Sequence, residues 1–342
     1  MKRRFVFPLL SIAAVIAVFF ITLRLAGPKE ERWITLYCLD DLVDPAMLQD
    51  FTQDTGIGVK VIHPKDEQEP RSPCEYDLIL TELSFLEELD QLGRLTPLDP
   101  ERVSLDSGAT VLYQEAVLGG THGSALPALW SIMGLLHDSA ASGVQVRGWY
   151  NLFDPDYPGV IDIAGNPLKG IAGALLAHNS SLVSPSPEQL LSAALSQMGQ
   201  RGRAFRYSTF HTMDEAFRTG SVALAPCYAA KAIPLMQDNP QLSFVAPIEG
   251  SWQSVLGYAI PKGCGDMEGA YALLNYLTRP YVMAKNSVWS GWSTPSPEAY
   301  RMLSPSWQRN PLAYPKGGLA SLKVLPILNY RTWSGFYLLP QS

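Results

Sequence analysis

The sequence predicts an α/β protein, and three observations lead to this prediction. First, a strand, a helix and two further strands follow one another within fifty residues of position 33. Second, 47% of the 342 residues are hydrophobic and only 17% are charged, which supplies ample apolar material for large cores. Third, the chain is about twice as long as a typical single domain, which favours two lobes or one large domain.

The first predicted elements follow from turn residues and apolar spacing. Residues 34–38 read as a strand, after which Pro45 opens a helix that ends at Gly56. The apolar face of this helix consists of Met47, Leu48 and Phe51. Alternation predicts a strand over 58–62, and the apolar run 76–80 is typical of a buried parallel strand.

Three later helices are predicted from apolar residues at helical spacing. One follows the third strand and carries Leu86, Leu89 and Leu92 on a single face. The others span 188–198, behind a Ser-Pro cap signal, and 268–277. These segments continue the α/β pattern along the chain.

The N-terminus carries an export signal or a membrane anchor, to which we assign residues 1–28. Three basic residues precede an uncharged run over 5–23, which would be roughly 28 Å long as a helix and so close to the thickness of a bilayer core. Usual signal peptides have shorter apolar regions of about 7–15 residues. Arg24 also occupies a position where cleavage after Ala26 needs a small residue, so an uncleaved anchor is favoured. The positive-inside rule then places the chain after residue 28 in the periplasm.

Several classes of function are disfavoured by the composition and by missing motifs. The net charge of −6 argues against nucleic-acid binding, and no phosphate-binding glycine loop or serine-nucleophile motif occurs. The five histidines are scattered, and the four cysteines lack the close pairs of zinc sites. We therefore expect no catalytic residues, metal or cofactor. The cysteines are Cys38, Cys74, Cys227 and Cys264, for which free thiols and one or two disulfides both remain open.

A series of short motifs follows the apolar run in a fixed order. The motifs are Leu48-Gln49-Asp50-Phe51-Thr52, Leu126-Pro127-Ala128-Leu129-Trp130, Gly148-Trp149-Tyr150-Asn151-Leu152-Phe153 and Gly291-Trp292-Ser293-Thr294-Pro295. Each motif alone is weak. Their collinear succession over residues 33–316 resembles the spermidine/putrescine-binding periplasmic proteins of ABC importers, within the type II extracellular solute-binding fold.

The resemblance implies a two-lobed protein with a ligand cleft between the lobes, preceded here by the N-terminal hydrophobic helix. Lobe 1 would comprise 33–129 plus 256–292, and lobe 2 would comprise 130–255 plus 293–342. Such a protein is a monomer and not an enzyme. It captures a small solute by lobe closure and delivers it to ABC permease subunits in the inner membrane.

The resemblance places candidate ligand-binding residues at strand ends of lobe 1. Asp40 and Asp41 follow the first strand. Asp41 keeps the acid of the family and Asp40 stands at its hydroxyl residue, whereas both neighbouring aromatics of the family are replaced by leucines. Glu82 stands where the family has a ligand-contacting serine. Ser84 or Phe85 falls near a family tyrosine, depending on a shift of one residue.

The remaining candidates lie later in the chain and depart further from the family. Two family acids fall at Asn166 and Lys169, and a family tryptophan falls at Pro226, close to Tyr228. A family Trp-x-Asp pair falls at Ser254 and Leu256, with Trp252 two residues upstream as a substitute. Trp292 stands at the tyrosine of the family's Gly-Tyr-x-Thr-Pro motif and keeps an aromatic side chain there.

Three functional interpretations stay open. In the first, Asp41 and Glu82 bind a polyamine or another small cation, while Trp252 and Trp292 stack on it. In the second, Lys169 and Asn166 bind a carboxylate, a sulfonate or a zwitterion. In the third, the chain is an anchored sensor or scaffold without a transport role. The first 32 residues carry a net charge of +4 and the rest carries −10, which favours a cationic solute at long range.

Overall fold

The computed structural model of the protein describes residues 32–64, 73–104, 123–162, 167–182, 184–199, 205–206, 210–315 and 324–325. The predicted N-terminal helix over 5–23 and the candidate Asn166 lie outside these described residues. Within the described ranges, no helix is long and apolar enough to cross a membrane.

The strands of the described residues belong to one ten-stranded sheet. Its order is β2-β1-β3-β9-β4-β7-β5-β6, with β10 beside β9 and β8 beside β4. The strands are β1 Arg32–Cys38, β2 Ile57–Ile62, β3 Leu78–Glu82, β4 Ala125–Asp138, β5 Ile161–Asp162, β6 Phe205–Arg206, β7 Leu224–Tyr228, β8 Leu242–Val245, β9 Ser251–Ala259 and β10 Val324–Leu325. The three predicted strands are confirmed, although β3 begins two residues later than the run 76–80.

Helices cover the sheet along its length. The longer ones are α2 Pro45–Thr55, α3 Leu83–Gln91, α6 Pro167–Ala177, α7 Pro187–Gly199, α8 Phe210–Arg218, α9 Ala229–Asp238, α10 Met267–Leu277 and α11 Pro280–Ser290. The short ones are α5 Ser139–Ser142, α12 Pro297–Met302 and α13 Pro305–Gln308, with 3-10 turns η1 Pro73–Glu75 and η2 Trp149–Leu152. The helices predicted after Pro45, after the third strand and over 188–198 and 268–277 are confirmed as α2, α3, α7 and α10.

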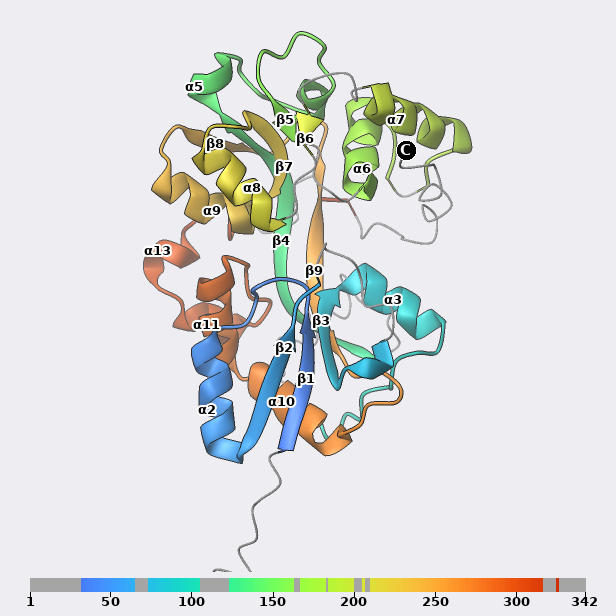
Figure 1. Cartoon of the computed structure of the whole chain (residues 1–342), viewed down its shortest axis with the longest axis vertical. Coiled ribbons are helices and arrows are strands. Elements are labelled where there is room, and N and C mark those ends of the chain that lie inside the picture. The colour runs from blue at the N-terminus through green and yellow to red at the C-terminus, as the bar shows by residue number, and fades with distance from the viewer. Residues whose placement is uncertain are drawn as a thin grey trace, which may run out of the picture.

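Two groups of elements are connected by the long strands β4 and β9 (Figure 1). The group built on β1, β2 and β3, with α2, α3 and α10 around it, is called the β1 lobe here. The group built on β5, β6, β7 and β8, with α6 to α9 around it, is called the β7 lobe. The first part of β4 pairs with β9, and its last residues pair with β7 and β8, so a single strand runs from one lobe into the other.

Local sequence signals set the ends of α2 beside the first strand. The side chain of Asp44 accepts a hydrogen bond from the amide of Ala46, and Pro45 fits the first helical turn because it has no N–H to satisfy there. Gly56 ends the helix in the left-handed region at φ 72°, where a glycine has no Cβ to clash. These signals return the chain into β2, which pairs in parallel with β1.

All four cysteines are free thiols in the structure. Cys38 and Cys227 are buried, Cys264 is half-buried and Cys74 is exposed. Burial raises the pKa of the Cys38 thiol to about 12. Of the alternatives left open by the sequence, the structure therefore has thiols and not disulfides.

Candidate ligand-binding site

Two carboxylates of the β1 lobe come from the ends of adjacent strands. Asp40 follows β1 and Glu82 ends β3, and these strands are paired in parallel up to Cys38 and Leu80. Parallel strands place their carboxyl ends at the same edge of a sheet. Both carboxylates therefore lie at the edge of the β1 lobe that meets the β7 lobe, where each forms an ion pair with a lysine.

Glu82 is the centre of a cluster that spans the two lobes. Its Oε1 atom lies 3.6 Å from Nζ of Lys169 and accepts a 3.1 Å hydrogen bond from the Tyr228 hydroxyl. Glu82 also occupies the N-cap position of α3 without a capping hydrogen bond from its side chain, so its carboxylate is directed to these partners in the β7 lobe. The cluster brings together residues from β3, α6 and β7.

Aromatic rings pack around the charges of this cluster. Nζ of Lys169 lies 4.8 Å from the centroid of the Tyr228 ring, within the range of a cation–π contact. The Tyr228 and Trp292 ring centroids are 5.1 Å apart. Ser254, on β9, is buried beside them and hydrogen bonds to the Tyr228 hydroxyl. We call Glu82, Lys169, Tyr228, Ser254 and Trp292 the Glu82 cluster.

Burial controls the protonation of the tyrosine in this cluster. The pKa of Tyr228 is raised, first because burial disfavours the phenolate and second because Glu82 is negative. The charge of Lys169 and its hydrogen bond oppose this rise, as does the hydrogen bond of Ser254. Tyr228 is therefore a neutral hydrogen-bond donor to Glu82 at physiological pH.

A second ion pair connects the lobes beside the Glu82 cluster. Nζ of Lys231, on α9, lies 2.6 Å from Oδ2 of Asp40, and the two side chains are 17% and 7% exposed. Burial lowers the pKa of Lys231, but the charge and hydrogen bond of Asp40, together with smaller contributions from Asp214 and Cys227, outweigh this effect, so the net pKa is raised. Lys231 is therefore a cation in the folded protein. The sequence did not mark it as a site residue.

The two lysines occupy equivalent places in the β7 lobe. Lys169 is the third residue of α6, and Lys231 is the third residue of α9. A cation in the first turn of a helix is unfavourable, by about 0.3–1 kcal/mol, because the helix dipole is positive at that end. Carboxylates of the β1 lobe offset this cost. A lysine just after a strand, in a first helical turn, is the sequence signal that could have identified Lys231.

The other predicted residues lie apart from these contacts or have other partners. Asp41 is exposed and accepts a 3.2 Å hydrogen bond from the Trp289 indole. Ser84 and Phe85 are half-buried on α3, and Phe85 packs against the main core. Trp252 is only 3% exposed.

The buried ring of Trp252 has a structural partner that the sequence did not predict. It stacks on Trp149 with centroids 5.0 Å apart and planes 14° apart. The Trp149 indole donates a 2.8 Å hydrogen bond to the carbonyl of Gly250, just before β9. This stack attaches η2 to β9 and accounts for the burial of Trp252.

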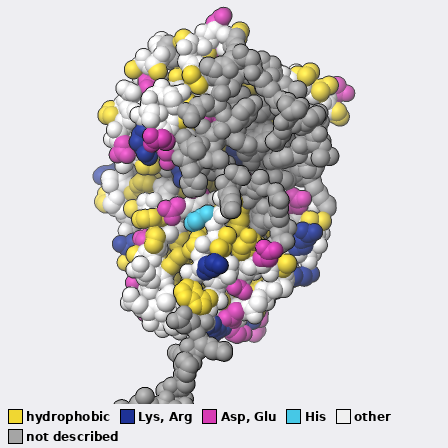
Figure 2. Space-filling model, in the orientation of Figure 1, with side chains coloured by type: hydrophobic (Ala, Val, Ile, Leu, Met, Phe, Trp, Pro, Cys, Tyr) yellow, Lys and Arg dark blue, Asp and Glu magenta, His cyan; other side chains and the backbone are white. Residues whose placement is uncertain are grey.

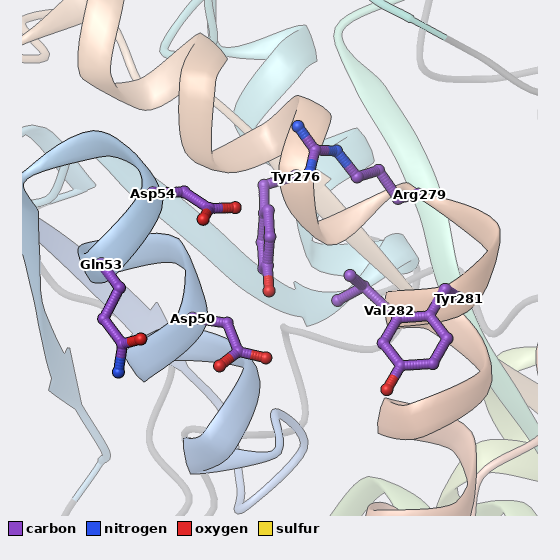
Figure 3. Close-up of a pocket in the computed structure, with 7 residues that line it drawn as sticks. All are labelled: Asp50, Gln53, Asp54, Tyr276, Arg279, Tyr281 and Val282. Carbon is purple, nitrogen blue, oxygen red and sulfur yellow. The ribbon is translucent and has the colours of Figure 1, made fainter.

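A separate pocket of about 390 Å³ lies between α2 and the junction of α10 with α11. Figure 3 shows Asp50 and Asp54 of α2 reaching towards the Tyr276 ring, with Arg279 on the other side of the ring. The pKa of Tyr276 is raised, first by burial and then by the charge of Asp50. The pocket contains none of the predicted ligand-binding residues. Its lining is Asp50, Gln53, Asp54, Tyr276, Arg279, Tyr281 and Val282.

Charges are mixed on the described surface that Figure 2 shows, where acidic and basic side chains are scattered among hydrophobic ones. The described residues contain no group of three or more His, Cys, Asp or Glu side chains that could hold a metal ion.

Comparison with known proteins identifies the family of this chain. Residues 46–315 match the family model described as bacterial extracellular solute-binding protein. The chain belongs to this family. The spermidine/putrescine-binding periplasmic protein of Escherichia coli K12 is 23% identical over 303 residues, which cover 85% of each chain. The resemblance read from the collinear motifs is therefore confirmed.

Solved structures confirm the α/β fold of the solute-binding proteins. The spermidine/putrescine ABC transporter substrate-binding protein PotD from Streptococcus pneumoniae superposes with a TM-score of 0.72 at 20% identity, covering 90% of this chain and 96% of that one. A structure described as the Atu4243 GABA receptor has a TM-score of 0.71 at 15% identity, covering 89% and 93%. At these identities the likeness shows the fold and not the ligand.

Proposed function

We propose that this protein is the periplasmic solute-binding component of an ABC importer, which captures a small solute between its lobes and delivers it to a membrane permease. The observation that carries the proposal is the convergence of charged and aromatic side chains from both lobes on Glu82. A solute held between two lobes favours the closed state by its differential affinity, and the permease would recognise that closed state. The role is binding and not catalysis.

The lobe boundaries belong to this proposal. Lobe 1 comprises 33–129 with 256–292, and lobe 2 comprises 130–255 with 293–342. Residues 5–23 tether the protein to the inner membrane, so the lobes stay close to the permease. The crossing of β4 from β9 to β7 supports a hinge along this strand.

The first candidate solute is a polyamine. The Escherichia coli relative is named for spermidine and putrescine, and Glu82 and Asp41 supply negative charge. Trp292 and Tyr228 supply aromatic faces for the methylene chain. The net charge of −10 after residue 32 would draw a cation to the protein.

A second candidate, a zwitterion that carries an ammonium and a carboxylate, is favoured by two observations. Lys169 and Lys231 place two cations at the lobe interface, where they could bind a carboxylate. The buried indole N–H of Trp292 has no hydrogen-bond acceptor among the described residues. An indole N–H only donates, and a protonated polyamine offers no acceptor. The family fold also occurs in a protein described as a GABA receptor.

A thermal-shift panel on the full chain in detergent tests both candidates. The panel contains putrescine, spermidine, γ-aminobutyrate, other amino acids and sulfonates. A solute at 100 times its dissociation constant should stabilise the protein by about 2.7 kcal/mol. The absence of a shift with either polyamine at millimolar concentration would refute the first candidate, and the same result with the zwitterions would refute the second.

The transport role needs a separate measurement in cells. Deletion of the gene should abolish the uptake of the radiolabelled solute that the panel identifies, and the wild-type gene should restore it. Uptake that continues unchanged in the deletion strain would contradict the importer and favour the anchored sensor. Deletion of residues 5–23 alone should prevent export from the cytoplasm.

A further inference from the structure

The ion pairs between the lobes have a common architecture. Each pairs a carboxylate at a strand end of the β1 lobe with a lysine in the first turn of a β7-lobe helix, as Asp40 with Lys231 and Glu82 with Lys169. The four side chains are largely removed from water, with exposed fractions between 7% and 24%. Charges in such surroundings must be paired.

The lysine side chains end in the same chemical group as an aliphatic amine solute. An alkyl chain with a terminal ammonium, next to a carboxylate and an aromatic ring, is how a polyamine would be bound. Lys169 already makes both contacts, with Glu82 at 3.6 Å and with the Tyr228 ring at 4.8 Å. The protein thus supplies its own ammonium groups at the lobe interface.

We infer that Lys169 and Lys231 are built-in counter-ions that hold the lobes together without a solute and compete with cationic solutes for Glu82 and Asp40. Separation of the lobes would break both ion pairs and expose a negatively charged face on the β1 lobe and a positively charged face on the β7 lobe. A cationic solute must displace a lysine before it reaches the carboxylate. A zwitterion can instead enter between the partners, with its ammonium on the acids and its carboxylate on the lysines. This inference rests on the proposed function in one respect, namely that the solute binds at the interface between the lobes.

The distance between the lobes, measured without any solute, tests the first half of the inference. Spin labels on the exposed Cys74, between β2 and β3, and on Asp238→Cys, at the end of α9, report this distance in the full chain. The Cys264→Ser change removes the other accessible thiol. The wild-type chain should have one population at short distance.

The double variant Lys169→Met/Lys231→Met keeps the linear side chains but removes both ammonium groups. The ratio of closed to open molecules should fall at least about tenfold, which corresponds to about 1.4 kcal/mol. Lys285→Met, on the exposed face of α11, removes one ammonium group by the same substitution away from the ion pairs and should leave the distances unchanged. A double variant with the wild-type distance distribution would overturn the inference.

A second pair of substitutions keeps the test decisive if the lysine variant does not fold. Asp40→Asn/Glu82→Gln preserves the shape of both side chains and removes both negative charges. It should open the lobes in the same way as the lysine variant. An unchanged distance distribution in this variant would also overturn the inference.

Titration calorimetry with putrescine tests the competition. Lys169→Met should bind putrescine at least about tenfold more tightly than the wild-type chain, because Glu82 then has no internal ammonium. Equal or weaker binding by Lys169→Met would refute the competition. If neither chain binds putrescine while the distances change as expected, the polyamine candidate fails and the counter-ion role stands.

Discussion

The contact between Gly291 and α9 yields a prediction about how closely the lobes approach. Gly291 ends α11 in the left-handed region at φ 79°, and its amide hydrogen bonds to the carbonyl of Ser287. A Cβ atom built on Gly291 would overlap the backbone carbonyl of Ala230 in the first turn of α9. Gly291→Ala therefore introduces a methyl group at a place where helices of the two lobes touch.

The cost of this substitution has two parts that a control separates. An alanine in the left-handed region costs about 1–2 kcal/mol, and overpacking against an immobile backbone atom costs about 1–3 kcal/mol more. Gly220 follows α8 at φ 66°, and a Cβ there would have nothing within 4 Å. Gly220→Ala should thus show the first cost alone, and Gly291→Ala should show both.

Urea unfolding of the two full-length variants and of the wild type measures these costs. We expect Gly291→Ala to lose about 1–3 kcal/mol more than Gly220→Ala. Spin-label distances between the lobes should also increase in Gly291→Ala if the protein relieves the overlap by opening. Equal stability losses in the two variants, with unchanged distances, would show that α11 and α9 do not touch in solution.

Three further predictions follow from other contacts. Trp252→Ala should lower the free energy of unfolding by about 3–5 kcal/mol. Trp252→Phe should leave the solute affinity unchanged in calorimetry, and a large loss of affinity would contradict the packing role of Trp252. At pH 8, a thiol reagent should modify Cys74 within minutes but Cys38 only after denaturation, because burial raises the pKa of Cys38 to about 12; fast modification of both would refute this. The hydrogen bond from Arg32 lowers the pKa of Asp266. The stability that this carboxylate contributes is therefore present above about pH 4, and it is lost as the pH falls through the pKa of Asp266 in the folded protein. Unfolding curves of Asp266→Asn and wild type should therefore differ at pH 7 and converge near pH 2; a constant difference would contradict this assignment.

Local signals in the sequence predicted the early elements of the fold well. Pro45 and Gly56 bound α2 because a proline fits the first helical turn and a glycine accepts a positive φ. Apolar residues at helical spacing identified α3, α7 and α10, because each of these helices buries one face. Such signals depend on neighbouring residues, and a sequence displays them directly.

The candidate site was predicted less completely. Five predicted residues lie together in the structure, and their role in binding a ligand stays a prediction: Glu82, Lys169, Tyr228, Ser254 and Trp292. The place of Lys231 in a first helical turn was the local signal for it, but its partner Asp40 lies 191 positions earlier in the chain and is not revealed by its neighbours. The sequence predicts that Trp252 stacks on the solute, whereas in the structure its ring stacks on Trp149, about one hundred residues away along the chain.

The sequence by itself determined the α/β class, the first three strands, four of the helices and the family, because these depend on periodicity, turn residues and the succession of motifs. Only the tertiary structure decided the pairing of charges between the lobes. Asp40 and Glu82 read as free acids in the sequence, and they become partners of Lys231 and Lys169 when β4 and β9 bring the lobes together. The physical reason is that an ion pair depends on distances of a few ångströms between residues that are far apart along the chain, and chain folding alone sets those distances.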